Sequence, residues 1–108
     1  MLLRFGVVSD IHCTDNSEDR TNKYLGQAFD FLKEKAGGHL DCIAIPGDVT
    51  QWGRQPQLEM FNKILVEHID AKETPVINCS GNHDQRDDTG LPPFEERMES
   101  LLDEANYK

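Results

Sequence analysis

The chain has 108 residues, of which 37% are hydrophobic and 29% charged, and it carries a formal net charge of −9. This length and composition predict one globular domain. Proteins that bind a nucleic-acid backbone present basic surfaces, so the acidic balance argues against that partner. No apolar stretch approaches the roughly 20 residues that a membrane span needs, so we expect no membrane association.

The cysteines argue for a reducing environment. Cys13, Cys42 and Cys79 are odd in number and form no CxxC pair, which argues against a disulfide framework and against a structural zinc site. The N-terminal stretch MLLRFGVVSD has no apolar region long enough for a signal peptide, because Asp10 ends it. We therefore expect a cytoplasmic protein.

The first half of the chain predicts two strands and two helices. Residues 2–8 are nearly continuous apolar and predict a strand. Residues 23–36 predict a helix that ends at two glycines. Residues 42–45 form a second apolar run, closed by Pro46 and Gly47. Residues 57–69 show helical spacing. The predicted buried faces are Tyr24, Ala28, Phe31 and Leu32 in the first helix, and Leu58, Phe61, Ile64, Leu65 and His68 in the second.

The second half predicts one further strand and helix. Residues 74–77 form the third apolar run, and residues 94–105 predict a helix that starts after two prolines. The order β-α-β-α-β-α predicts an α/β fold with a largely parallel sheet and right-handed crossovers. The short apolar runs are typical of strands buried on both faces. Right-handed crossovers, however, put both connecting helices on one face, so the other face needs a cover: a missing C-terminal half, the last helix, or a second copy of the chain.

Polar side chains follow each predicted strand. Ser9-Asp10-Ile11-His12 follows the first, Gly47-Asp48 the second and Gly81-Asn82-His83-Asp84 the third. DxH and GD alone are ordinary turn sequences, whereas GNHD is rare by chance. Because parallel strands end at one edge of the sheet, where ligands bind in such folds, we expect the three segments to meet there.

Carboxylate, amide and imidazole groups together are typical of a site for divalent metal ions. Asp10 and His12, two residues apart, can bind one ion. Asp48 can bridge two ions about 3.5–4 Å apart, with Asn82 on the second. We expect His83 to point away from the ligands, toward the substrate, where it protonates a leaving alkoxide or stabilises the transition state. Asp84 would hold the His83 ring in one tautomer.

These motifs resemble those of the calcineurin-like metallophosphoesterases, whose pattern is DxH, GD, GNH[DE], a separate His and GHxH. By this resemblance Asp10, His12 and Asp48 bind the first metal, Asp48 and Asn82 bind the second, and His83 is the catalytic histidine. The implied fold is an α/β sandwich of two sheets. The segments GDVTQWG and GNHD look most like the branch of class III cyclic-nucleotide phosphodiesterases and unlike the protein Ser/Thr phosphatases.

The resemblance covers the first half of the family pattern. No histidine follows Asp84, so the separate His and GHxH are missing, and His39 and His68 belong to the opposite edge of the sheet. Of the two divalent ions of the intact family site (Mn, Fe, Zn or Co), we expect one or none to be well held. We therefore expect residues 1–108 to be the N-terminal portion of a longer enzyme, with self-association through the uncovered sheet face as the alternative.

Three functions follow from these patterns. The first is hydrolysis of a small phosphomonoester or phosphodiester, impaired or absent in this chain alone. The second is a non-catalytic scaffold or partner-binding module on the same fold. The third, a metal-free nucleotide-binding domain, lacks any glycine-rich phosphate loop. Trp52, after the GD loop, either flanks the substrate pocket or packs against a helix.

Overall fold

The computed structural model describes residues 2–86, 90–105 and 107. Its elements are β1 (Phe5–Val7), α1 (Arg20–Lys35), β2 (Cys42–Ile45), α2 (Gln55–His68), β3 (Val76–Asn78) and α3 (Phe94–Glu104). The strands form one sheet in the order β1-β2-β3, and both pairs are parallel. The predicted α/β fold and its β-α-β-α-β-α order are confirmed.

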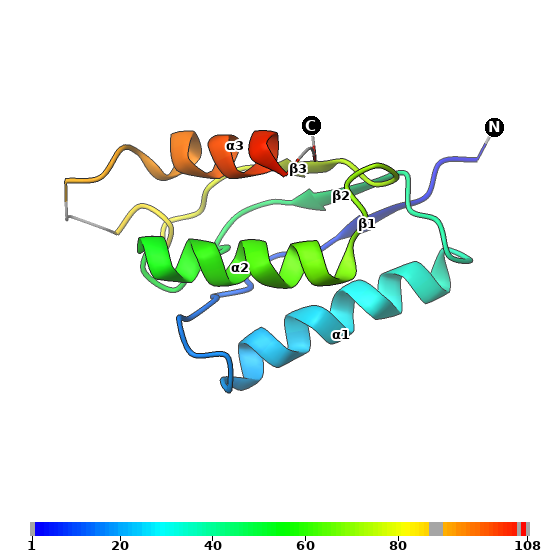
Figure 1. Cartoon of the computed structure of the whole chain (residues 1–108), viewed down its shortest axis with the longest axis horizontal. Helices are drawn as coiled ribbons and strands as arrows, with labels where there is room; N and C mark the ends of the chain where they lie inside the picture. Colours follow the sequence, from blue (N-terminus) through cyan, green and yellow to red (C-terminus); the bar gives the residue numbers. More distant parts are fainter. Residues whose placement is uncertain (1, 87–89, 106, 108) are drawn as a thin grey trace.

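Helices α1 and α2 pack against each other and against one face of the sheet (Figure 1). Gly6 in β1 leaves room for α1, because a Cβ there would lie 2.7 Å from a methyl carbon of Leu32. The predicted core face of α2 is confirmed: four of its side chains are buried, and His68 is half-buried. These four are Leu58, Phe61, Ile64 and Leu65.

The predicted core face of α1 is wrong for Tyr24 and Phe31, whereas Leu32 packs against the core and Ala28 is half-buried. Tyr24 and Phe31 are 58% and 55% exposed, whereas Leu25 and Phe29, which lie one turn apart, are buried. The prediction assumed that the aromatic residues mark the buried side of α1. The buried side instead includes the polar residue Asn22, whose side chain donates hydrogen bonds to the backbone of the preceding loop. These hydrogen bonds join the first turn of α1 to that loop.

The strands alternate between a buried face and an exposed face, so the expectation that they are buried on both faces is wrong. Val7, Ala44 and Ile77 are cross-strand neighbours, and on this face Phe5, Val7 and Ile77 are 58%, 56% and 64% exposed. We call this surface the open sheet face. The expectation that the connecting helices leave one face uncovered is confirmed for the part of the chain that the structure describes.

Helix α3 does not cover the open sheet face. It runs beside β3 at the edge of the sheet (Figure 1), where the backbone N–H of Val76 donates to the Tyr107 carbonyl at 2.9 Å. The Tyr107 hydroxyl donates to the carbonyl oxygen of Ile69 at 2.6 Å, which ties the end of the chain to α2. The α3 residues Phe94, Met98 and Leu102 thus extend the α2 side of the core.

Among the described residues, no helix has the length and apolar character needed to cross a membrane.

Candidate metal centre

The loops that follow β1 and β2 run side by side at the carboxyl edge of the sheet. The backbone N–H of Asp10 donates to the Gly47 carbonyl at 3.2 Å, and that of His12 donates to the Asp48 carbonyl at 3.0 Å. Asp10, His12 and Asp48 have φ values of 53°, 52° and 51°. This left-handed conformation is unfavourable for residues other than glycine and concentrates at functional sites.

The glycines of the GD and GNHD motifs let the loops after β2 and β3 touch. A Cβ on Gly47 would lie 3.2 Å from the Gly81 Cα, and a Cβ on Gly81 would lie 2.2 Å from Asp48 Oδ1. The backbone N–H of His83 then donates to that same Oδ1 at 3.0 Å. The close approach of two backbones therefore places the Asp48 carboxylate beside the third motif.

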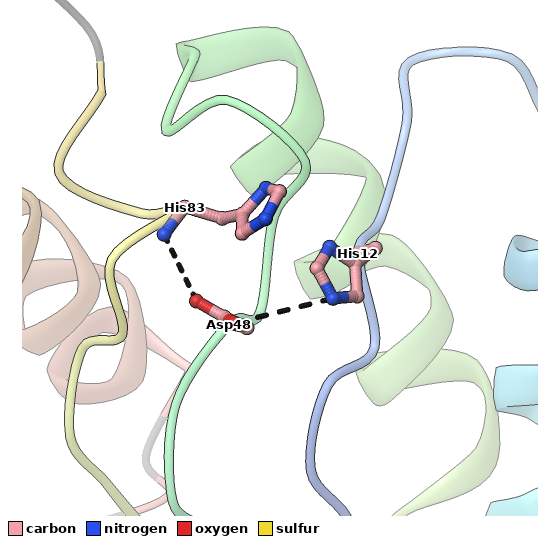
Figure 2. Close-up of side chains that lie close together, drawn as sticks. All are labelled: His12, Asp48 and His83. Atoms are coloured by element: carbon pink, nitrogen blue, oxygen red, sulfur yellow. Dashed lines mark hydrogen bonds and ion pairs between the residues drawn. The ribbon is translucent and has the colours of Figure 1, made fainter.

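His12, Asp48 and His83 form a cluster in which one potential ligand atom of each lies within 4.8 Å of the others. His12 Nε2 is 4.0 Å from Asp48 Oδ2, and the His12 and His83 rings meet edge to face with centroids 4.4 Å apart. Figure 2 shows the two imidazoles above the Asp48 carboxylate, each on its own loop. We call this cluster the His-Asp-His triad.

The His12–Asp48 pair has the spacing of two ligands of one divalent metal ion, and His83 lies within 4.8 Å of both. Protein N and O ligands lie about 2.0–2.2 Å from such an ion, so two of them lie up to about 4.4 Å apart, and the His12–Asp48 distance of 4.0 Å meets that limit. Asp48 is also well shielded, with a side chain only 13% exposed. Two imidazole nitrogens and a carboxylate suit Mn, Fe, Co or Zn.

Gln51 orients both imidazoles. Its side-chain Oε1 lies 2.9 Å from His12 Nδ1, and its backbone carbonyl lies 2.8 Å from His83 Nδ1. Oxygen atoms of this kind only accept hydrogen bonds, so each Nδ1 carries the proton and each Nε2 keeps its lone pair. This is the tautomer that a metal ligand requires.

His83 does not lie as expected. We predicted that its side chain points away from the metal ligands, but the hydrogen bond to the Gln51 carbonyl draws its ring over the loop after β2 and into the triad. Its predicted catalytic role remains a prediction.

Asp84 does not hold the His83 ring. Its side chain is buried (1% exposed) and accepts hydrogen bonds from the backbone N–H groups of Val49, Thr50 and Gly81 and from the Thr50 hydroxyl, at 2.7–3.1 Å. The carboxylate therefore joins the loops after β2 and β3. The predicted pairing with His83 is corrected, because the Gln51 carbonyl takes the Nδ1 position instead.

Asp10 and Asn82 lie at the same edge but outside the triad. Both are exposed, and Asp10 Oδ2 accepts a hydrogen bond from the Ser9 hydroxyl at 3.0 Å. Asn82 precedes His83 in the third motif. Their metal-binding roles, and the second metal ion, remain predictions.

The other candidate side chains have local roles. His39 and His68 bond Asp41 and Asp30, each at 2.9 Å, far along the fold from the triad, as predicted. Burial and, to a smaller extent, the nearby charge of Asp84 raise the pKa of the Cys13 thiol to about 12. Cys13 is thus a core residue.

Gln51 was not among the predicted site residues, and the sequence left two positions open for Trp52. A glutamine in a turn carries no chemical signal by itself, and its contacts depend on how the loop curves over two other segments. The Trp52 ring is 42% exposed and lies 6.1 Å from the His83 ring, so Trp52 flanks the site.

Comparison with known proteins agrees with this geometry. The family model for calcineurin-like phosphoesterases matches residues 3–107. Comparison with curated proteins and with solved structures returned no match.

Proposed function

The chain belongs to the calcineurin-like phosphoesterase family, and from this premise we propose that it is a metal-dependent phosphoesterase that hydrolyses a small phosphate ester. The observation that carries the proposal is the meeting of His12, Asp48 and His83 from three separate loops. The orientation of both imidazoles by Gln51 supports it, because each Nε2 is left ready to bind.

In this proposal His12 and Asp48 hold the divalent ion, and Asp10 and Asn82 add ligands from the same edge. When bound, the ion supplies Lewis-acid polarisation of the phosphoryl group and activates water for attack on phosphorus. His83 presents Nε2 to the same space, because its Nδ1 bonds the Gln51 carbonyl. When Nε2 also carries a proton, so that the ring is an imidazolium, His83 would donate that proton to the departing alkoxide or stabilise the charge of the transition state.

We propose that these 108 residues hold one divalent ion well rather than two. Histidines occur only at positions 12, 39, 68 and 83, and the second and third of these bond local carboxylates. A dinuclear centre with Asp48 as the bridge would need ligands from outside residues 1–108 or from another copy of the chain.

We also propose to which branch of the family the substrate specificity belongs. GDVTQWG and GNHD support a cyclic-nucleotide phosphodiesterase-like specificity, in which one ester bond of a cyclic phosphodiester is hydrolysed. Three free thiols, at Cys13, Cys42 and Cys79, are consistent with the proposed cytoplasmic location.

The first experiment measures metal content and turnover together. The chain is loaded with Mn²⁺, freed of excess metal, analysed for elements and assayed with bis-p-nitrophenyl phosphate. We expect one equivalent or less and weak or no turnover, and His12→Ala lowers the metal content whereas the matched variant His39→Ala does not. Equal metal content in all three proteins would contradict the proposed site, and two equivalents with rapid turnover would contradict the single-ion proposal.

The open sheet face supports a second function, binding of a partner through the same scaffold. Phe5 and Val7 on β1 and Ile77 on β3, the two strands that flank β2, are more than half exposed, and apolar surfaces of this kind mark interaction sites. We propose self-association through this face. Sedimentation equilibrium should show a concentration-dependent dimer that Val7→Lys dissociates, and a monomer at all concentrations would contradict it.

A further inference from the structure

A second cluster stands beside the triad and brings a positive charge to it. Trp52, in the loop after β2, lies 6.1 Å from the His83 ring, and the Arg86 guanidinium lies 5.1 Å above the centre of the Trp52 ring. The backbone N–H of Arg86 donates to the His83 carbonyl at 3.4 Å, so Arg86 belongs to the same turn as His83. Trp52 and Arg86 are both exposed.

Hydrogen bonds to neighbouring segments position the two loops that carry this cluster. The Trp52 backbone N–H donates to Gln57 Oε1 at 2.8 Å, in the first turn of α2. Asp84, between His83 and Arg86, joins the turn to the loop after β2 through its buried carboxylate. The same two loops that form the triad therefore also fix the separation of Trp52 and Arg86.

Because the protein is acidic overall, a positively charged side chain beside the triad is important for binding an anionic substrate. With a net charge of −9, the protein repels an anionic ester at long range. Arg97, another arginine near this edge, is already bonded to protein oxygens, to the Gly53 carbonyl at 2.7 Å and to Gln55 Oε1 at 3.2 Å. Arg86 presents an exposed guanidinium over the exposed indole of Trp52.

We propose that Arg86, positioned by Trp52, is the phosphate-recognition residue of this site and pairs with an oxygen of the substrate's phosphoryl group. A guanidinium matches phosphate oxygens with two parallel hydrogen bonds. Stacking on the indole reduces the freedom that the side chain loses when it binds an anion. This inference rests on the proposed function, since it assigns the anion-binding part of the same site.

Trp52 also provides the measurement, because it is the only tryptophan in the chain. Inorganic phosphate is titrated into the Zn²⁺-loaded chain and into the metal-free chain at constant ionic strength, and the fluorescence of Trp52 is followed. We expect a saturable change in both states, tighter with Zn²⁺. Arg86→Ala should weaken phosphate binding about tenfold in both states, as loss of a charge-assisted hydrogen bond predicts, and Arg86→Lys should recover part of it.

The matched control is Lys72→Ala, which removes one exposed positive charge from the turn before β3, at the opposite edge of the sheet. It should leave phosphate affinity unchanged. Equal weakening by Lys72→Ala, wild-type affinity in Arg86→Ala, or no saturable change in the wild-type chain would each overturn the inference. Circular dichroism of each variant confirms that it is folded.

The two proposals fail separately. Zn²⁺ affinity is measured on the same proteins by calorimetry, and Arg86→Ala should leave it within twofold of wild type. A chain that binds Zn²⁺ but shows no role for Arg86 overturns this inference alone. A chain that binds phosphate through Arg86 but does not bind Zn²⁺ would contradict the proposed metal centre. The proposed role of Arg86 in phosphate binding would then still stand.

Discussion

The two edges of the sheet carry the same residue types in different arrangements. At the amino edge, His39 and His68 each bond one carboxylate directly, that of Asp41 or Asp30. At the carboxyl edge, His12 and His83 instead bond neutral oxygens of Gln51. Exposed pairs of the first kind contribute little free energy, whereas the second arrangement leaves both Nε2 atoms and a shielded carboxylate around one point.

The comparison shows that a histidine beside an aspartate does not by itself make a site. What distinguishes the carboxyl edge is a third residue, Gln51, that bonds both imidazoles at Nδ1 and leaves each Nε2 near the carboxylate. It also requires backbone in a left-handed conformation at Asp10, His12 and Asp48, which the loop contacts must stabilise. Four variants test this difference, from the largest expected effect to the smallest.

Removing the Asp84 carboxylate should destabilise the loops at the carboxyl edge of the sheet. Asp84→Ala leaves the N–H groups of Val49, Thr50 and Gly81 without their buried acceptor, so we expect a loss of about 3 kcal/mol in the free energy of unfolding. Urea denaturation measures it, with Asp41→Ala, at the half-buried carboxylate of the amino edge, as the control. A loss no larger than that of the control would show that the Asp84 hydrogen bonds contribute little to stability.

Removing a triad ligand should abolish tight metal binding without unfolding the chain. We expect His12→Ala and Asp48→Asn each to weaken Zn²⁺ binding more than about 100-fold, since loss of an orienting partner alone costs about 10–100-fold. Calorimetry measures the affinity. His68→Ala, at the amino edge, should bind like wild type, and an equal loss there would erase the distinction between the two edges.

Gln51→Ala should affect the His12 imidazole and leave that of His83 unchanged. The substitution removes the acceptor of His12 Nδ1 but keeps the backbone carbonyl that bonds His83 Nδ1. We expect Zn²⁺ affinity to fall about tenfold. Long-range ¹H–¹⁵N spectra should show a mixed tautomer for His12 and an unchanged Nδ1–H tautomer for His83, whereas a change at both rings would contradict this division of roles.

Removing a carboxylate at the amino edge should change the stability only slightly, and only at acidic pH. The hydrogen bond from His68 lowers the pKa of Asp30. A carboxyl with a lowered folded pKa stabilises the protein above its unfolded value of about 3.9 and loses that contribution as the pH falls through the folded value. Asp30→Asn should therefore flatten the stability curve below about pH 4 by no more than about 0.5 kcal/mol, which thermal unfolding from pH 2 to 7 would reveal. A steeper acid limb in the variant would contradict the assigned direction.

The sequence by itself determined the order of the elements, the parallel sheet and the gathering of three motifs at one edge. These follow from short-range patterns: apolar runs ended by glycine or proline, helical spacing in α2, and the rule that parallel strands end together. Asp10, His12, Asp48, Asn82 and His83 could be named for the same reason, since each stands directly after a strand.

Only the tertiary structure decided which groups meet. The role of Asp84 depends on donors more than 30 positions earlier in the chain, and Gln51 reaches His12 across 39 positions. The rotation of α1, which buries Phe29 and exposes Phe31, depends on contacts with other elements. Such outcomes depend on the relative placement of loops, and local sequence patterns report the conformation of a segment rather than its distance from another one.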